Sequence, residues 1–106
     1  MEKRYKIVVY VPESHSEKVR VALGEAGAGK IGKYTFCTFT SRGVGRFLAG
    51  EGANPAIGEV GKLEAVEEER IETVCEESKL QAVIKAMKDV HPYEEVAFDI
   101  YLLESF

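Results

Sequence analysis

Hydrophobic positions in the first half of the chain follow two periods, one typical of strands and one typical of helices. Residues 5–11 are mainly aromatic and β-branched and stop at Pro12, which cannot donate to a strand ladder, so they predict a strand. Apolar residues then recur at i, i+3, i+4 and i+7 from Val19 to Ala26, which predicts an amphipathic helix that ends in glycine. Residues 34–40 alternate with apolar or neutral side chains on both sides, and they predict a second strand that is buried on both faces.

The second half of the chain repeats this arrangement after a glycine-rich stretch. Residues 43–61 are rich in Gly, Asn and Pro and predict a long loop with, at most, short extended pieces. Residues 62–75 favour a third strand, and residues 80–87 repeat the apolar spacing of the first helix. Residues 96–103 predict a closing strand.

Each predicted helix is preceded by a serine with a Glu or Gln three residues later, which is the pattern of a capping box. The pairs are Ser14 with Glu17 and Ser78 with Gln81. The resulting order, βαββαβ, predicts an α+β fold: a ferredoxin-like split βαβ sandwich with an antiparallel sheet, both helices on one face, and a long loop between strands 2 and 3. The other face of that sheet carries aromatic and β-branched residues, so we expect another copy of the chain to cover it.

Length and composition fit one ordinary domain. The chain has 106 residues, of which 45% are hydrophobic and 30% charged, and residues 1–106 are expected to form a single domain. No apolar run reaches the ~20 residues of a membrane span and no signal-peptide pattern opens the chain, which predicts a cytoplasmic protein with no membrane contact. Cys37 and Cys75 lie far apart without a CxxC motif, so both are expected to be buried small hydrophobes.

Charges are divided unevenly between the two halves of the chain. Residues 1–48 carry a balance of +5 and residues 49–106 a balance of −9. Nucleic-acid binding requires clustered cations on one face, so we expect no nucleic-acid partner. Opposite charges would instead attract within one fold or between copies of it. We interpret the acidic run from Glu64 to Glu77 as a solvated edge or an edge between subunits.

Two glycine motifs imitate phosphate-binding loops. Gly27, Gly29 and Gly32 spell GxGxxG, and residues 24–30 spell GxxxxGK. A phosphate-binding loop follows a strand and opens a helix, whereas these glycines follow a helix and precede a strand. We therefore interpret them as a helix stop and a turn.

His91, Glu94 and Glu95 are a local cluster of candidate metal ligands. Residues so close in sequence could share one divalent ion only through a tight turn, and most metal sites need three or four ligands. The alternative is a turn before the last strand, fixed by Pro92, whose side chains bond to the backbone. The other histidine, His15, lies in the first turn of the first helix. No residue is assigned a catalytic role.

Six segments, taken in order along the chain, resemble one known family. They are GAGKIGKYTFCTF at residues 27–39, GVGRF at 43–47, GEGANPAIG at 50–58, KLE at 62–64, HPYEE at 91–95 and DIY at 99–101. This series closely resembles the middle domain of YqfO-type, Nif3-like proteins. The HPYE segment also resembles the closing turn of the CutA family, and the order of elements resembles that of the PII signalling proteins.

The resemblance implies a PII-like or CutA-like ferredoxin fold that assembles as a homotrimer with its sheets facing inward. In the full-length relatives, the dinuclear metal site and the loose description as a GTP cyclohydrolase-type homologue belong to two flanking lobes, for which we expect no counterpart in 106 residues. A small-molecule cleft between subunits, at the base of the long loop, is the feature that carries over, with a nucleotide ligand only by analogy. The matching residues are Gly43, Gly45, Arg46, Phe47, Glu51, Asn54, Gly58 and Glu59, with Tyr93 near the same cleft.

The leading interpretation is a non-enzymatic trimeric module that binds a small ligand or a divalent metal ion at subunit clefts. It would present loop 43–61 to a protein partner, with Arg46 as an anion contact and His91 with Glu94 or Glu95 as a cation contact. Two alternatives stay open: a metal-dependent hydrolase like the longer relatives, and a purely structural trimerisation module.

Overall fold

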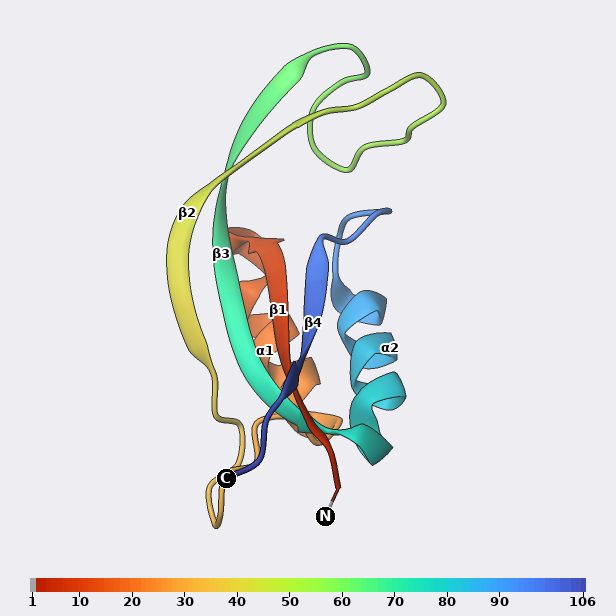
Figure 1. The fold of residues 1–106 in the computed structure, drawn as a ribbon. Helices are drawn as coiled ribbons and strands as arrows, with labels where there is room; N and C mark the ends of the chain where they lie inside the picture. Colours follow the sequence, from red (N-terminus) through yellow and green to blue (C-terminus); the bar gives the residue numbers. More distant parts are fainter. Residues whose placement is uncertain (1) are drawn as a thin grey trace.

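The chain folds around a four-stranded antiparallel sheet with its most apolar strand in the centre. The computed structural model describes residues 2–106 and contains β1 (Arg4–Pro12), β2 (Phe39–Leu48), β3 (Leu63–Glu76) and β4 (Phe98–Leu103). The strand order is β2-β3-β1-β4, with every neighbouring pair antiparallel (Figure 1). This is the ferredoxin-like βαββαβ fold that the sequence predicts.

Both helices pack on one face of this sheet. They are α1 (Ser16–Glu25) and α2 (Leu80–Val90), and they contact each other as well as the strands. The core lies between the helices and the sheet, where apolar side chains are buried. Full burial of one large apolar side chain stabilises the fold by about 1.5–3 kcal/mol. Its buried members are Ile7, Val9, Val11, Val19, Leu23, Ala28, Ile71, Cys75, Val83 and Met87. None of the helices that the described residues form is long and apolar enough to cross a membrane.

The helix starts differ from the predicted capping boxes. A short 3-10 turn, Glu13–His15 or Glu77–Lys79, precedes each helix, and neither helix has a side-chain hydrogen bond at its N-cap. Ser14 Oγ lies instead 2.8 Å from Nδ1 of His15. The capping-box prediction is wrong because a 3-10 turn, with its tighter hydrogen-bonding pattern, replaces the side-chain cap at the helix start.

The strand predicted over residues 34–40 is also wrong. Ile31 and Tyr34 form a tight turn with two backbone hydrogen bonds of 2.9 Å, and Phe36 has a φ of 59°, in the left-handed region. β2 begins only at Phe39, which is 69% exposed, and it continues through glycine-rich residues 43–48. The connection from β2 to β3 therefore comprises residues 49–62, shorter than the predicted loop 43–61 at its start.

Two smaller predictions can be compared directly with the backbone. Gly27, Gly29 and Gly32 have φ values of 110°, 80° and 58°, as expected of a helix stop and a turn, which confirms that interpretation. Cys75 is buried as predicted, whereas Cys37 is only half-buried because it lies in the turn rather than in a strand.

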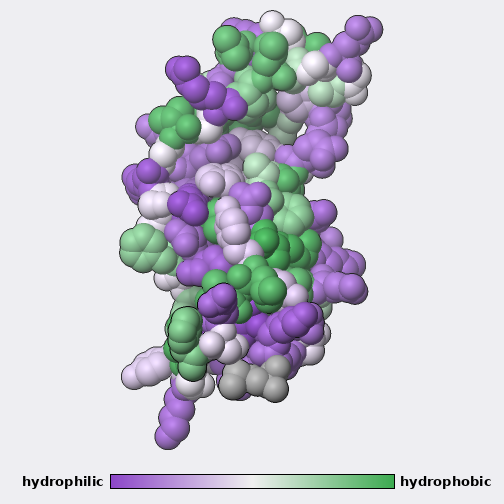
Figure 2. Space-filling view, viewed as in Figure 1, coloured by the Kyte–Doolittle hydropathy of each residue, from purple (hydrophilic) through white to green (hydrophobic). Residues whose placement is uncertain are grey.

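The β2–β3 hairpin extends beyond the rest of the sheet as an arm. β1 pairs with β3 only as far as Glu68, so residues 63–67 of β3 pair with β2 alone. Loop 49–62 folds back at the top of this arm, above the segment that joins α2 to β4 (Figure 1). The space-filling view shows hydrophobic residues at the top of the arm and again over the lower half of the sheet (Figure 2). On the arm, the exposed apolar residues are Val44, Leu48, Val60 and Leu63.

Candidate functional site

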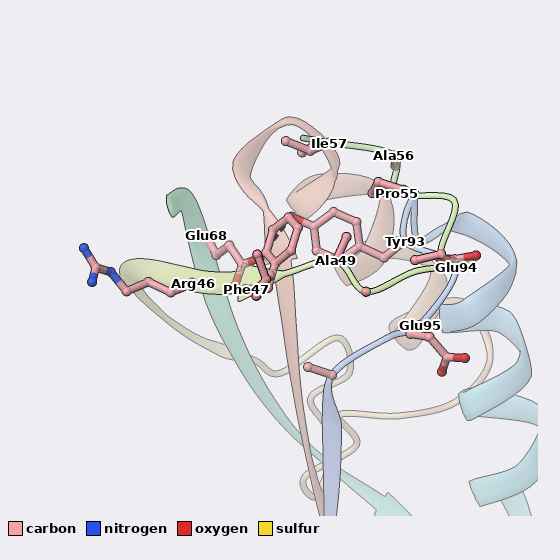
Figure 3. A pocket seen from close by; sticks show the side chains of 15 residues that line it. Arg46, Phe47, Ala49, Pro55, Ala56, Ile57, Glu68, Tyr93, Glu94 and Glu95 are labelled. Atoms are coloured by element: carbon pink, nitrogen blue, oxygen red, sulfur yellow. Dashed lines mark hydrogen bonds between the residues drawn. The ribbon is translucent and has the colours of Figure 1, made fainter. Parts of the chain in front are cut away.

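A hollow of about 380 Å³ lies where the arm, loop 49–62 and the turn before β4 meet (Figure 3). Three parts of the chain form it: residues 45–57, which include the end of β2 and most of the loop, Glu68 of β3, and residues 93–97 before β4. Antiparallel pairing of β2 with β3 brings the first two together. Most of its lining is apolar. The lining residues are Gly45, Arg46, Phe47, Leu48, Ala49, Gly50, Ala53, Pro55, Ala56, Ile57, Glu68, Tyr93, Glu94, Glu95 and Ala97.

Two aromatic rings and one carboxylate occupy the centre of this hollow. The rings of Phe47 and Tyr93 lie side by side, with centroids 6.2 Å apart and planes inclined by 59° (Figure 3). The Tyr93 hydroxyl donates a hydrogen bond of 3.1 Å to Oε2 of Glu68. Burial, together with this hydrogen bond, raises the pKa of the Tyr93 hydroxyl, so Tyr93 stays protonated and remains the donor.

Gly45 allows the Glu68 side chain to occupy this position. Gly45 lies within β2, and a Cβ atom there would collide with the carboxylate of Glu68. In contrast, a Cβ at Gly43 would meet nothing within 4 Å. Gly45 is therefore a close-approach glycine of the kind that interrupts strands next to functional groups.

His91 fixes the turn that carries Tyr93. Its side chain is 7% exposed, and Nε2 lies 2.8 Å from the carbonyl oxygen of Tyr10 in β1. The backbone N–H of Tyr93 donates to Nδ1 of His91 at 3.1 Å, so Nδ1 is the acceptor and Nε2 carries the proton. Burial lowers the pKa of His91 and keeps the ring neutral. His91 thus joins the turn before β4 to the centre of the sheet.

Loop 49–62 is closed on itself and tied to the same turn. Gly61 N–H donates to the carbonyl of Ala49 at 2.8 Å, where Ala49 and Val60 form a parallel bridge. The backbone N–H of Asn54 donates to Oε2 of Glu94 at 2.8 Å. These bonds hold the loop over the hollow.

The structure brings together about half of the site residues predicted from the sequence. Gly45, Phe47 and Tyr93 line the hollow, as do Glu94 and Glu95. Glu51 and Glu59 are exposed and do not line it; Gly43 borders a second, smaller hollow, and Gly58 packs against Glu64. Asn54 acts through its backbone.

Arg46 does not fit the anion contact that we expected. Its backbone lines the hollow, but its side chain extends away from Phe47 and Tyr93 (Figure 3). The reason is the alternation of the strand, which turns consecutive side chains of β2 to opposite faces. In this geometry the Arg46 guanidinium does not reach a ligand in the hollow of its own chain.

His91, Glu94 and Glu95 do not come together as a metal-ligand set within one chain. Both ring nitrogens of His91 are engaged by backbone groups, and Glu94 holds the loop. Among residues 2–106, no three His, Cys, Asp or Glu side chains are grouped in a way that could hold a metal ion. The metal contact therefore stays a prediction that the contacts within the chain do not support.

Sequence reasoning missed Glu68. It lies in the acidic run that was interpreted as a solvated or intersubunit edge, yet only Glu67 of the three consecutive glutamates is exposed. Glu69 is 8% exposed and pairs with Arg20 at 2.8 Å on the helix side, while Glu68 points to the other face and into the hollow. Alternation along β3 separates them, and the isolated glycine at Gly45 was the available signal for a close approach.

The fold and the site place the chain in one structural class. CutA from Archaeoglobus fulgidus, a periplasmic divalent cation tolerance protein, matches 97% of this chain with 18% identity and a TM-score of 0.70, over 86% of its own length. GlnK of Bacillus subtilis, solved with ATP, matches 97% of this chain with 17% identity and a TM-score of 0.65, over 84% of its length. At these identities the likeness concerns the fold, which is the CutA-like and PII-like ferredoxin fold.

Closer relatives are longer proteins. The GTP cyclohydrolase 1 type 2 homolog of Bacillus subtilis is 58% identical over 99 residues, which are 93% of this chain and 26% of that protein. The Mycobacterium tuberculosis homolog is 52% identical over 98 residues. A Bacillus cereus protein related to NIF3 matches 98% of this chain with 53% identity and a TM-score of 0.86, over 26% of its own length. No family model matches the chain.

These comparisons confirm the resemblance inferred from the sequence. Nearly the whole chain corresponds to a PII-like and CutA-like segment of NIF3-related proteins. The chain spans about a quarter of the length of the curated relatives it matches.

Proposed function

We propose that this chain is a homotrimeric CutA/PII-like module that binds a small ligand in the hollow between the arm and the turn before β4. The observation that carries this proposal is the hollow itself, with Phe47, Tyr93 and Glu68 converging at its centre. Its volume of about 380 Å³ falls in the range of about 300–1,000 Å³ typical of small-molecule sites. A mostly apolar lining with a few convergent polar groups is the usual composition of such sites.

The hollow is also held in shape before any ligand arrives. His91 fixes the turn that carries Tyr93, and Glu94 ties that turn to loop 49–62. A preformed site loses less conformational entropy on binding than one that must be assembled. This rigidity supports binding as the role of the hollow.

Trimerisation is supported by the face of the sheet that the helices leave uncovered. Strand register aligns Val8, Glu72, Phe39 and Asp99 across that face. Phe39 is 69% exposed and lies on this face next to charges of both signs, such as Glu72 and Arg70. An exposed aromatic residue among opposite charges is suited to contact with further copies of the same surface.

A protein partner would contact the outer end of the arm. Four apolar side chains are exposed there: Val44, Leu48, Val60 and Leu63. This position agrees with the expectation that the connection between β2 and β3 contacts a protein partner. The residues that would make the contact are the exposed apolar side chains and not the glycines beside them. A pull-down from lysate compares the proteins captured by Leu48→Ser and Leu63→Ser with those captured by the unsubstituted chain. Capture of the same proteins by all three would refute this contact.

Sedimentation velocity and NMR titration together test the main proposal. Sedimentation should give a trimer, and ¹⁵N-labelled protein titrated with pools of amines, carboxylates, nucleotides and divalent cations should show shifts concentrated at Gly45, Phe47 and Tyr93. A monomer that binds at this hollow would overturn trimerisation alone. Shifts that no pool produces there would overturn the binding role and leave a structural module.

The hydrolase alternative has no comparable support in this chain. The name GTP cyclohydrolase 1 type 2 homolog belongs to relatives about four times as long. Among residues 2–106 no set of three metal-binding side chains is grouped, so no observation here favours the alternative over the binding module.

A further inference from the structure

The charged group that faces the two rings inside the hollow is a carboxylate, that of Glu68. Glu68 is half-buried, and the ion pairs recorded among residues 2–106 do not include it. Glu94 and Glu95 line the same hollow from the turn before β4, but their carboxylates extend away from the two rings (Figure 3). The nearest basic residue of the lining, Arg46, directs its side chain away (Figure 3). A ligand beside the two rings therefore meets the carboxylate of Glu68 and no guanidinium or ammonium group from the described lining.

The inner carboxylate keeps acceptor capacity for a ligand. Glu68 Oε2 accepts one hydrogen bond from the Tyr93 hydroxyl, and no hydrogen bond to Oε1 is recorded among the described residues. A carboxylate can accept about four hydrogen bonds in total. A positively charged group next to this half-buried carboxylate would be attracted more strongly than at a fully exposed one, because part of the surrounding water is excluded.

The aromatic rings select the same kind of group. Phe47 and Tyr93 are both half-buried and lie at the centre of the hollow beside Glu68. Aromatic rings attract organic cations through their quadrupole, and the attraction grows when the site is desolvated. An apolar wall formed by Ala53, Pro55 and Ile57 would accommodate the body that carries the charge.

We propose that the hollow takes an organic cation, an ammonium or amidinium group on a flat or apolar body, with Glu68 as its counter-ion and Phe47 and Tyr93 as its aromatic contacts. This inference rests on the proposed binding function and adds the class of ligand. It departs from the anion contact expected at Arg46. A bare divalent metal ion is a poorer fit because it requires several oxygen or nitrogen ligands around one point, whereas Glu68 is flanked by rings.

Three compounds of the same shape test the charge preference. Benzamidine is cationic, benzamide is neutral and benzoate is anionic, and all three carry the same phenyl ring. In NMR titrations of the ¹⁵N-labelled chain, benzamidine should shift the amides of Gly45, Phe47 and Tyr93 at the lowest concentration. It should bind at least about tenfold more tightly than benzamide, as one charge-assisted hydrogen bond would give.

A pair of neighbouring substitutions tests the role of Glu68. Glu68→Gln keeps the shape and can still accept from Tyr93, and it should weaken benzamidine binding at least about tenfold while changing benzamide binding by less than about threefold. Glu67→Gln removes the same charge from the opposite side of β3, where Glu67 is exposed, and should change neither. Matching ¹H–¹⁵N spectra would show that both variants are folded.

Each other outcome refutes a defined part of the argument. Benzoate or ATP binding at these amides without benzamidine binding would overturn the cationic class and leave the proposed binding function standing. Equal weakening by Glu68→Gln and Glu67→Gln would show general attraction by the acidic half and overturn the role of Glu68 as counter-ion. No response to any of the compounds would overturn both this inference and the binding role of the hollow.

Discussion

Replacing His91 by Ala should destabilise the whole fold. His91 is 7% exposed and bonds to the carbonyl of Tyr10 and to the N–H of Tyr93, so its removal leaves two partly buried backbone groups without these partners. Each buried group left unsatisfied costs about 1–3 kcal/mol, or about 2–6 kcal/mol for two. Because both groups are only partly buried, we expect the lower part of this range, a loss of about 2–4 kcal/mol in the free energy of unfolding. Urea denaturation followed by far-UV circular dichroism at about pH 7.5 measures this loss.

The pH dependence of stability gives an independent test of the same residue. Burial lowers the pKa of folded His91 below its ordinary value of 6.5, while the hydrogen bond to the Tyr10 carbonyl and the negative charge of Glu68 oppose the shift. As the pH falls below 6.5, the unfolded chain takes up a proton that the folded chain does not, so stability decreases by at most about 1.4 kcal/mol per pH unit. His91→Ala should lose this slope between about pH 7 and pH 5.

His15→Ala is the matched control, since it removes the other histidine. His15 bonds to Ser14 at the start of α1 and not to the interior, so we expect a change within about 0.5 kcal/mol and a slope from His91 that persists. The reasoning fails if His91→Ala unfolds at the same urea concentration as the unsubstituted chain. It also fails if the stability of the unsubstituted chain is the same at both ends of the pH range.

Two further substitutions test the other half of the sheet. Glu69→Gln should cost about 1–3 kcal/mol, because the 8%-exposed carboxylate loses its ion pair with Arg20. The hydrogen bond from Arg20 lowers the pKa of Glu69, so the ion pair stabilises the fold above pH 4.5 and this stabilisation is lost as the pH falls further. The Glu69→Gln variant should not show this loss of stability in acid. Gly45→Ala should weaken benzamidine binding by displacing Glu68, whereas Gly43→Ala should leave it unchanged in the same NMR titration.

Apolar periodicity was sufficient to predict the fold but not the ends of its elements. The spacing around Val83 and Met87 and the β-branched run before Pro12 correctly marked a helix and the central strand. Side chains alternate over residues 34–40 and so predicted a strand, but residues in an irregular turn can show the same alternation. Nothing in the local sequence shows that Phe36 adopts a positive φ. Tertiary packing decides that conformation, since the Phe36 ring lies against Gly24 of α1.

The candidate site was predicted by segment more than by residue. The turn that carries Tyr93 and the end of β2 that carries Phe47 were both expected near a cleft between subunits, and both line a hollow that one chain forms by itself. The chemistry of Glu68 could not be read locally, because three consecutive glutamates look alike until pairing with β2 and β1 assigns each a face. Arg46 was assigned a contact from its charge, although strand alternation turns its side chain away.

The hollow lies at the boundary between two parts of β3 whose amide hydrogens are protected from solvent exchange to different degrees. Residues 63–67 of β3 pair with β2 alone, whereas residues 68–72 are held between β2 and β1. Amide hydrogens in the outer part should therefore exchange with solvent through local opening, and those in the inner part only when the sheet opens. Glu68 lies at the boundary, so an occupant bound to it would slow exchange along the arm and make a small molecule visible far beyond the atoms it touches.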